Sequence, residues 1–166
     1  MTFSIGESFV GEGANAAHIN TMLGAKDGPV GVAWATALAT PRARHTPFVV
    51  VVKPNVPVKP MTLFVNKASV EPGDHAHANL TWGAAQAGVA AGVLAALRKG
   101  VVRPDDVDEL LLIAAVWVDP AADDEDAVYH NNTDATLGAL TAARDDLPSV
   151  RTVLDAGSPQ NPYFVR

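Results

Sequence analysis

The chain has 166 residues, 48% of them hydrophobic, which is enough for one domain with its own core and excludes a largely disordered protein. Its formal net charge of -6 at pH 7 argues against nucleic acid or an anionic membrane surface as the main partner. The absence of cysteine excludes disulfides and thiolate chemistry.

No sequence signal indicates a membrane or secreted protein. No apolar run reaches the roughly 18–20 residues that a bilayer-spanning helix needs. The first residues also lack the basic and apolar regions of a secretory signal. We therefore expect a cytoplasmic protein with no membrane partner, and in the absence of repeats or linkers we expect residues 1–166 to form a single domain.

The first quarter of the chain predicts two strands and a short helix. Residues 7–10 and 17–24 are apolar, strand-like segments on either side of a glycine-rich turn. Asp27-Gly28-Pro29 predicts another turn, and apolar side chains in residues 30–38 recur at the three- and four-residue spacing of a helix. Pro41 ends that helix.

The next segments predict strands. Residues 48–52, a phenylalanine followed by valines, form a continuous β-branched run that predicts a strand in the middle of a sheet. The prolines of residues 54–60 predict a stiff, extended connection that is not a central strand. Residues 62–70 alternate as a strand does. Lys67 and Ser69 then share a face, so a single ligand could touch both.

The second half of the chain predicts helices around one more strand. Residues 71–77 read as a loop, and residues 84–99 as the clearest helix, with Gly100 as its stop signal. Residues 110–118 predict another buried strand, and the acidic residues 123–126 begin a helix that reaches about Arg144. The last twenty residues look irregular. Together these elements predict an α/β (α+β) fold, a two-layer sandwich of one mixed sheet covered by helices.

Residues 6–18 are the most informative segment, because a glycine- and asparagine-containing turn leads there to His18 at the start of an apolar stretch. Imidazole is the side chain whose ordinary pKa lies nearest neutrality, so a histidine held in this way suits proton transfer. Taken alone, a histidine with one structural hydrogen bond is the simpler interpretation.

This segment resembles the beginning of the formaldehyde-activating enzyme family. The matching residues are Gly6, Glu7, Val10, Gly11, Gly13, Ala17, His18 and Ile19. Further matches follow in the family's order over about residues 6–145: Lys26-Asp-Gly-Pro29, His45-Thr-Pro47, Lys53-Pro-Asn55, Pro57, Lys59-Pro60, Thr62-Leu63, Asn66-Lys67, Gly83, Ala85-Gln86 and Ala121-Ala-Asp-Asp124. We therefore interpret the whole chain as one domain of this type.

The resemblance implies a function. The family condenses formaldehyde with tetrahydromethanopterin to methylene-tetrahydromethanopterin and water, which is a carbon-oxygen lyase (hydro-lyase) reaction without a metal or redox cofactor. It implies a role in one-carbon metabolism, methylotrophy or formaldehyde detoxification. It also implies a fold akin to the second domain of a small-subunit ribosomal protein, assembled as a homopentamer, with a site between subunits.

The resemblance also assigns the site residues. Its general acid corresponds to His18, and its pterin-contacting positions correspond to Asn20, Val49, Lys67, Ser69 and Gln86. Lys67 and Gln86 keep the family residue, whereas Ser69 replaces threonine and Val49 replaces leucine. Asn20 replaces an aspartate. An amide brings one acceptor and two donor hydrogens in place of a charged acceptor.

Two other functions remain open. The exchange at Asn20 favours a family member that binds a reduced pterin or a formaldehyde adduct without efficient turnover, as a carrier or sensor. The altered residues Val49 and Ser69 favour a lyase that acts on another aldehyde or on another reduced pterin such as tetrahydrofolate.

Three other sequence features are weaker evidence of function. His75 and His77, with Asp74, could bind a metal, but a solvated loop is the simpler interpretation. The glycines of residues 11–13 lack the remainder of a phosphate-binding motif and instead give the backbone flexibility before the histidine. The basic segment of residues 42–45 is expected to be exposed surface, although an anionic tail of a pterin cofactor could use its charges.

Overall fold

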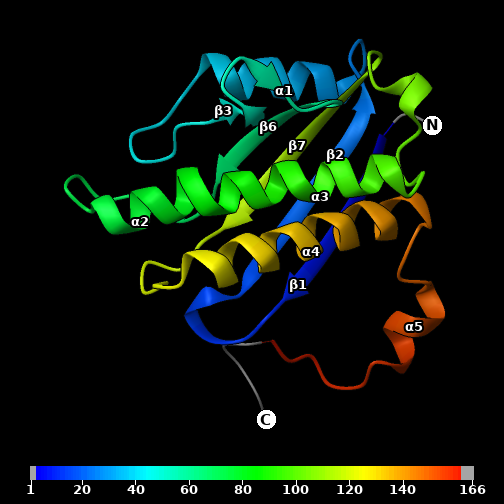
Figure 1. Ribbon diagram of the computed structural model, residues 1–166. Coiled ribbons are helices and arrows are strands. Elements are labelled where there is room, and N and C mark those ends of the chain that lie inside the picture. Colours follow the sequence, from blue (N-terminus) through cyan, green and yellow to red (C-terminus); the bar gives the residue numbers. More distant parts are fainter. Residues whose placement is uncertain (1–2, 162–166) are drawn as a thin grey trace.

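The computed structural model describes residues 3–161, which form a mixed sheet with helices packed on it (Figure 1). The five-stranded sheet has the order β1-β2-β7-β6-β3, and of the strand pairs in the described residues only β6 and β7 run parallel. Its strands are β1 Phe3–Val10, β2 Ala17–Ala25, β3 Phe48–Val49, β6 Met61–Asn66 and β7 Leu110–Trp117. A separate two-stranded sheet contains β4 Val51–Lys53 and β5 Val56–Pro57.

The helices complete the predicted two-layer sandwich. They are α1 Pro29–Ala39, α2 His75–Asn79, α3 Gln86–Arg98, α4 Glu125–Arg144 and α5 Val150–Asp155, with short turns η1 Gly13–Asn15 and η3 Pro104–Asp106 and a π-helical segment η2 Leu80–Ala85. Helices α3 and α4 lie side by side across one face of the sheet (Figure 1). The prediction of a mixed sheet covered by helices is therefore confirmed.

The core lies between the sheet and these two helices. On β2, Ala17 and Ile19 are fully buried in the same cluster as Val89 and Val93 of α3. Because side chains alternate along a strand, the residues between them point to the other side of the sheet. We call that side, opposite α3 and α4, the open face.

The open face is covered only in part. Helix α1 contacts β2 and β7, and its residue Ala37 shares a cavity with Val65 of β6, which lies between buried residues of that strand. Phe3, Ile5 and Phe9 of β1 remain exposed by 41%, 57% and 37%. The open face is therefore an apolar surface at the β1 side of the sheet.

The run of residues 48–52 does not form the central strand that its composition predicts. Strand β3 has only two residues and lies at the sheet edge, paired with β6. At Val50 the chain turns out of the main sheet, since the Val50 N–H donates to the Thr62 carbonyl (2.9 Å) while its own carbonyl accepts from Val58 N–H (3.1 Å). A continuous apolar run is compatible with both a central strand and an edge strand, because it indicates that the residues are buried but not where in the sheet they lie.

Residues 54–60 are also not a plain extended connection. β4 pairs with β5 as a small antiparallel hairpin. Asn55 occupies the turn in the left-handed region, with φ of 68°. Asparagine tolerates that conformation better than most residues.

The long helix begins nine residues earlier than the sequence indicates. Asp74 caps it, since its carboxylate accepts a hydrogen bond from the His77 N–H (3.0 Å). The stretch His75–Arg98 is 24 residues long, with mean hydropathy of 1.5 in its most apolar window. The expectation that no stretch reaches membrane-spanning length is thus wrong, although 56% of that window is buried inside the protein, as in a core helix.

Other boundaries differ less. The strand predicted over residues 62–70 ends at Asn66, and helix α5 lies where the chain was expected to be irregular. The part of that expectation that falls on residues 162–166 lies outside the described residues. The strands predicted at residues 7–10, 17–24 and 110–118 and the helices after Gly28 and before Arg144 are confirmed.

Helices α3 and α4 approach closely at two glycines. A Cβ atom on Gly88 would lie 2.5 Å from the Tyr129 carbonyl oxygen, and one on Gly92 would lie 2.6 Å from the Thr133 carbonyl oxygen. Backbone atoms cannot give way as a side chain can. Glycine at these positions therefore sets the distance between the two helices.

We predict that Gly92→Ala lowers the free energy of unfolding by about 1–3 kcal/mol, because the added methyl group forces α3 and α4 apart. Urea denaturation measures this. Gly83→Ala is the control, since nothing lies within 4 Å of a Cβ there. A Gly92→Ala protein as stable as the wild type would contradict the close helix contact.

Candidate active site

His18 lies on the open face as the second residue of β2. On β2 it is the register partner of Phe9 on β1 and of Trp117 on β7. Its sequence neighbours Ala17 and Ile19 are fully buried on the helix side. The pleat of the strand therefore places the imidazole on the open face.

Two residues of β1, Glu7 and Phe9, contact the imidazole. The Glu7 Oε1 lies 3.0 Å from His18 Nε2, and the two side chains are 60% and 43% exposed. The ring of Phe9 lies beside the imidazole, with a centroid distance of 5.9 Å. Among residues 3–161, His18 Nδ1 has no hydrogen-bond partner, so this nitrogen remains for a ligand.

A cavity of about 270 Å³, which we call the His18 cavity, opens beside this ring. Its lining residues are His18, Asn20, Lys67 and Trp117. The indole supplies an apolar wall, and its buried Nε1 has no hydrogen-bond partner in the part of the chain that the structure describes. The His18 cavity thus combines an imidazole with an amide, an ammonium group and a flat apolar surface.

Of the residues predicted to contact a pterin, Asn20 and Lys67 lie in the His18 cavity. The other three do not line it. Val49 is half-buried on the edge strand β3, opposite Leu63. Ser69 lies beyond the end of β6, where its hydroxyl donates to Glu71 Oε1 (3.0 Å).

Gln86 is placed on the other side of the sheet. It is 7% exposed at the start of α3, and its Oε1 accepts a hydrogen bond from the Val51 N–H (3.0 Å). Its Nε2 is 3.5 Å from the Val51 carbonyl oxygen. Within one chain, this amide therefore connects α3 to β4.

Two residues of the site are missed by the sequence analysis, Glu7 and Trp117. Glu7 is part of the motif that carries the resemblance, and pairing residues 7–10 with residues 17–24 in a hairpin brings it to the same face as His18. Trp117 belongs to the predicted strand of residues 110–118, and only the pairing of that strand with β2 brings it to the His18 cavity. The sequence contains the alternation but not the strand order.

The interpretation of residues 74–77 as a solvated loop is wrong. His77 is 2% exposed, and its Nε2 lies 3.0 Å from the Val118 carbonyl oxygen. His75 is exposed on the first turn of α2, and Asp74 is occupied as the helix cap. The two histidines therefore lie in different environments, one in the core and one at the surface.

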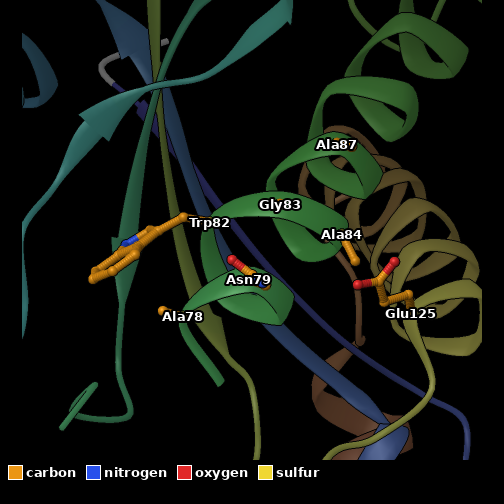
Figure 2. A pocket seen from close by; sticks show the side chains of 7 residues that line it. All are labelled: Ala78, Asn79, Trp82, Gly83, Ala84, Ala87 and Glu125. Carbon is orange, nitrogen blue, oxygen red and sulfur yellow. The ribbon is translucent and has the colours of Figure 1, made fainter. Parts of the chain in front are cut away.

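A larger cavity, of about 570 Å³, lies along the π-helical segment η2. Its lining residues are Ala78, Asn79, Trp82, Gly83, Ala84, Ala87 and Glu125 (Figure 2). Figure 2 shows the Trp82 indole projecting away from the helix, with the Glu125 carboxylate on the other side of Gly83 and Ala84. This cavity has one carboxylate and one amide but neither imidazole nor ammonium, so we place the candidate active site at the His18 cavity.

Comparisons with known proteins identify the family of the chain. The sequence model of the formaldehyde-activating enzyme family matches residues 5–164. Similar proteins named "bifunctional enzyme Fae/Hps" occur in Methanococcoides burtonii (41% identity over 150 residues), Archaeoglobus fulgidus (40% over 154) and Methanosarcina barkeri (39% over 153). These alignments cover 90%, 93% and 92% of this chain but 37%, 39% and 38% of the relatives. The chain thus spans less than two fifths of the length of these relatives.

We predict that His77→Gln lowers the free energy of unfolding by about 1–3 kcal/mol, because the Val118 carbonyl loses its buried partner. His75→Gln, at an exposed position on the same helix, should leave stability unchanged. Chemical denaturation of both variants measures the difference. Equal stability of the two proteins would contradict a core role for His77.

Proposed function

The chain belongs to the formaldehyde-activating enzyme family, and we propose that it condenses formaldehyde with tetrahydromethanopterin to methylene-tetrahydromethanopterin and water. In class terms this is a carbon-oxygen lyase of the hydro-lyase type. The observation that carries the proposal is His18, which contacts Glu7 through one ring nitrogen and lines the His18 cavity.

The reaction needs one proton at one step. A pterin-ring nitrogen adds to formaldehyde and gives a hydroxymethyl amine. Protonation of the hydroxyl lets it leave as water, and the resulting iminium is captured by the neighbouring arylamine nitrogen, which then gives up its proton. Acid catalysis of the departure of water typically contributes ~10²–10⁴-fold. Holding the two nitrogens near the reacting carbon adds to this.

His18 is the proposed general acid. In the imidazolium form both ring nitrogens carry hydrogens, so Nε2–H donates to the Glu7 carboxylate while Nδ1–H is available to the leaving hydroxyl. Glu7 fixes the orientation of the ring and supplies a negative charge next to the imidazolium. After the arylamine loses its proton, the imidazole can be protonated again, so no net proton is consumed.

The other cavity residues suit substrate positioning. The Asn20 amide offers a carbonyl oxygen and two N–H donors to the polar edge of a pterin, and the Lys67 ammonium donates to an oxygen. The indole ring of Trp117 gives a flat surface against which an aromatic ring can pack. Because the cavity is only about 270 Å³, it has room for the reacting rings but not for a long tail as well.

We propose further that a second copy of the chain completes the site, in a cytoplasmic homopentamer. Val49, Ser69 and Gln86 do not line the His18 cavity of a single chain, so their proposed pterin contacts would have to come from a neighbouring subunit. The exposed apolar side chains of β1 and Val32 of α1 (69% exposed) are the surface that such an assembly would cover. The number five rests on the family resemblance, as does a role in one-carbon metabolism, methylotrophy or formaldehyde detoxification.

A second candidate function follows from Asn20. An aspartate at this position would accept two hydrogen bonds and carry a charge, whereas the amide has one acceptor and no charge. A protein with this exchange would hold a reduced pterin or formaldehyde adduct less productively. It would then act as a carrier or sensor rather than as an efficient catalyst.

We predict that His18→Gln slows the protein-dependent condensation by ~10²–10⁴-fold, because the glutamine amide keeps the volume but cannot act as an acid near neutrality. Initial rates at saturating pterin measure this. His75→Gln is the matched control at an exposed position and should keep the full rate. A His18→Gln protein with undiminished acceleration would remove His18 from the mechanism.

For the second candidate function, we expect Asn20→Asp to raise the condensation rate at least tenfold if the amide is what limits turnover, since a charged acceptor strengthens the pterin hydrogen bonds. The comparison uses the same initial-rate assay for both proteins. An unchanged rate would show that Asn20 is not the cause of weak turnover.

A further inference from the structure

A second cavity, of about 400 Å³, adjoins the His18 cavity on the open face. Its lining residues are Ala37, Thr40, Arg42, His45, Pro47, Val65, Asn66 and Lys67. Lys67 lines both cavities, so they share a wall at this residue. We call the second one the basic cavity, because no carboxylate lines it.

The positive charges of the basic cavity have no partner in the part of the chain that the structure describes. Among residues 3–161, the side chains of Arg42 and Lys67 have neither an ion-pair nor a hydrogen-bond partner. By contrast, Lys26 pairs with Glu109. In a protein of net charge -6, two unpaired cations at one cavity form a local exception to the overall charge.

The loop that carries Arg42 is anchored rather than loose. His45 Nδ1 lies 3.1 Å from the Asn66 carbonyl oxygen, and Asn66 Nδ2 donates to the Arg44 carbonyl (2.9 Å). Arg44 in turn pairs with Glu71 at 2.8 Å. These contacts fasten the loop to the end of β6, next to Lys67, so the backbone that carries Arg42 is placed at the basic cavity before a ligand arrives.

We propose that the basic cavity binds the anionic tail of the reduced-pterin substrate while the His18 cavity holds the reacting rings. The inference rests on the proposed function, which supplies a pterin with such a tail. Guanidinium and ammonium groups bind the oxygens of phosphate and carboxylate, and Arg42 offers several donors in one plane. Lys67 lies at the boundary between rings and tail, and Ala37, Pro47 and Val65 give the basic cavity an apolar floor.

The test is the dissociation constant of tetrahydromethanopterin, measured by calorimetry without formaldehyde at low ionic strength. Arg42→Gln should weaken binding about tenfold, since it removes charge-assisted hydrogen bonds from a partly screened site. Arg98→Gln, the same change at an exposed position on α3 outside both cavities, should leave binding unchanged. Circular dichroism confirms that both variants are folded. Added salt should narrow the difference between wild type and Arg42→Gln.

Tetrahydrofolate distinguishes the two anionic groups that the tail could present, since its own tail carries carboxylates and no phosphate. If Arg42→Gln weakens both ligands equally, the basic cavity takes a carboxylate. If only tetrahydromethanopterin is weakened, the basic cavity takes the phosphate.

Equal affinity of wild type and Arg42→Gln for tetrahydromethanopterin would overturn the inference. Because the binding measurement contains no formaldehyde, it is independent of turnover. If the wild-type protein accelerates condensation while Arg42→Gln binds tetrahydromethanopterin normally, the proposed function is supported but the role of the basic cavity is excluded. The opposite result is also informative. If Arg42→Gln weakens binding as expected but the wild-type protein does not accelerate condensation, the role of the basic cavity is supported and the proposed reaction is excluded.

Discussion

The site depends on the alternation of side chains along β2. Ala17 and Ile19 are fully buried against the helices, and the pleat of the strand then directs His18 and Asn20 to the open face. A shift of one residue in register would move the imidazole into the core and Ile19 to the surface, at a cost of burying a polar group and exposing a large apolar one. Core packing thus fixes the position of the proposed acid without any contact between the core and the substrate.

The neighbouring strands supply the other residues of the site, because their side chains alternate between the two faces as those of β2 do. Antiparallel pairing with β1 places Glu7 next to the imidazole, and pairing with β7 places Trp117 on the other side. Lys67 follows β6, which runs parallel to β7 and adds its end to the same region. Because these strands are held by α3 and α4 on the opposite face, the polar groups of the His18 cavity are carried by rigid elements rather than by long loops.

Part of this arrangement can be predicted from the sequence. The two strands on either side of the glycine turn, and the position of His18 at the start of the second, follow from local patterns alone. The valine run at residues 48–52 misleads, because burial does not distinguish an edge strand that turns away from a central one. The sequence analysis places the start of the long helix too late, although Asp74 is a residue type that commonly caps helices. The reason is that the π-helical segment and the burial of His77 depend on contacts with distant residues. Strand order, which joins Glu7, His18 and Trp117, is a long-range property that no local pattern contains.

The proposed function assigns the condensation of formaldehyde with a reduced pterin to the His18 cavity. The most direct measurement is the initial rate of condensation with tetrahydromethanopterin, with and without the purified protein, in dilute solution where the uncatalysed reaction is slow. Acceleration in proportion to protein concentration is the predicted result, because one pre-arranged acid acts per site. A rate that is the same with and without protein would rule out the proposed function.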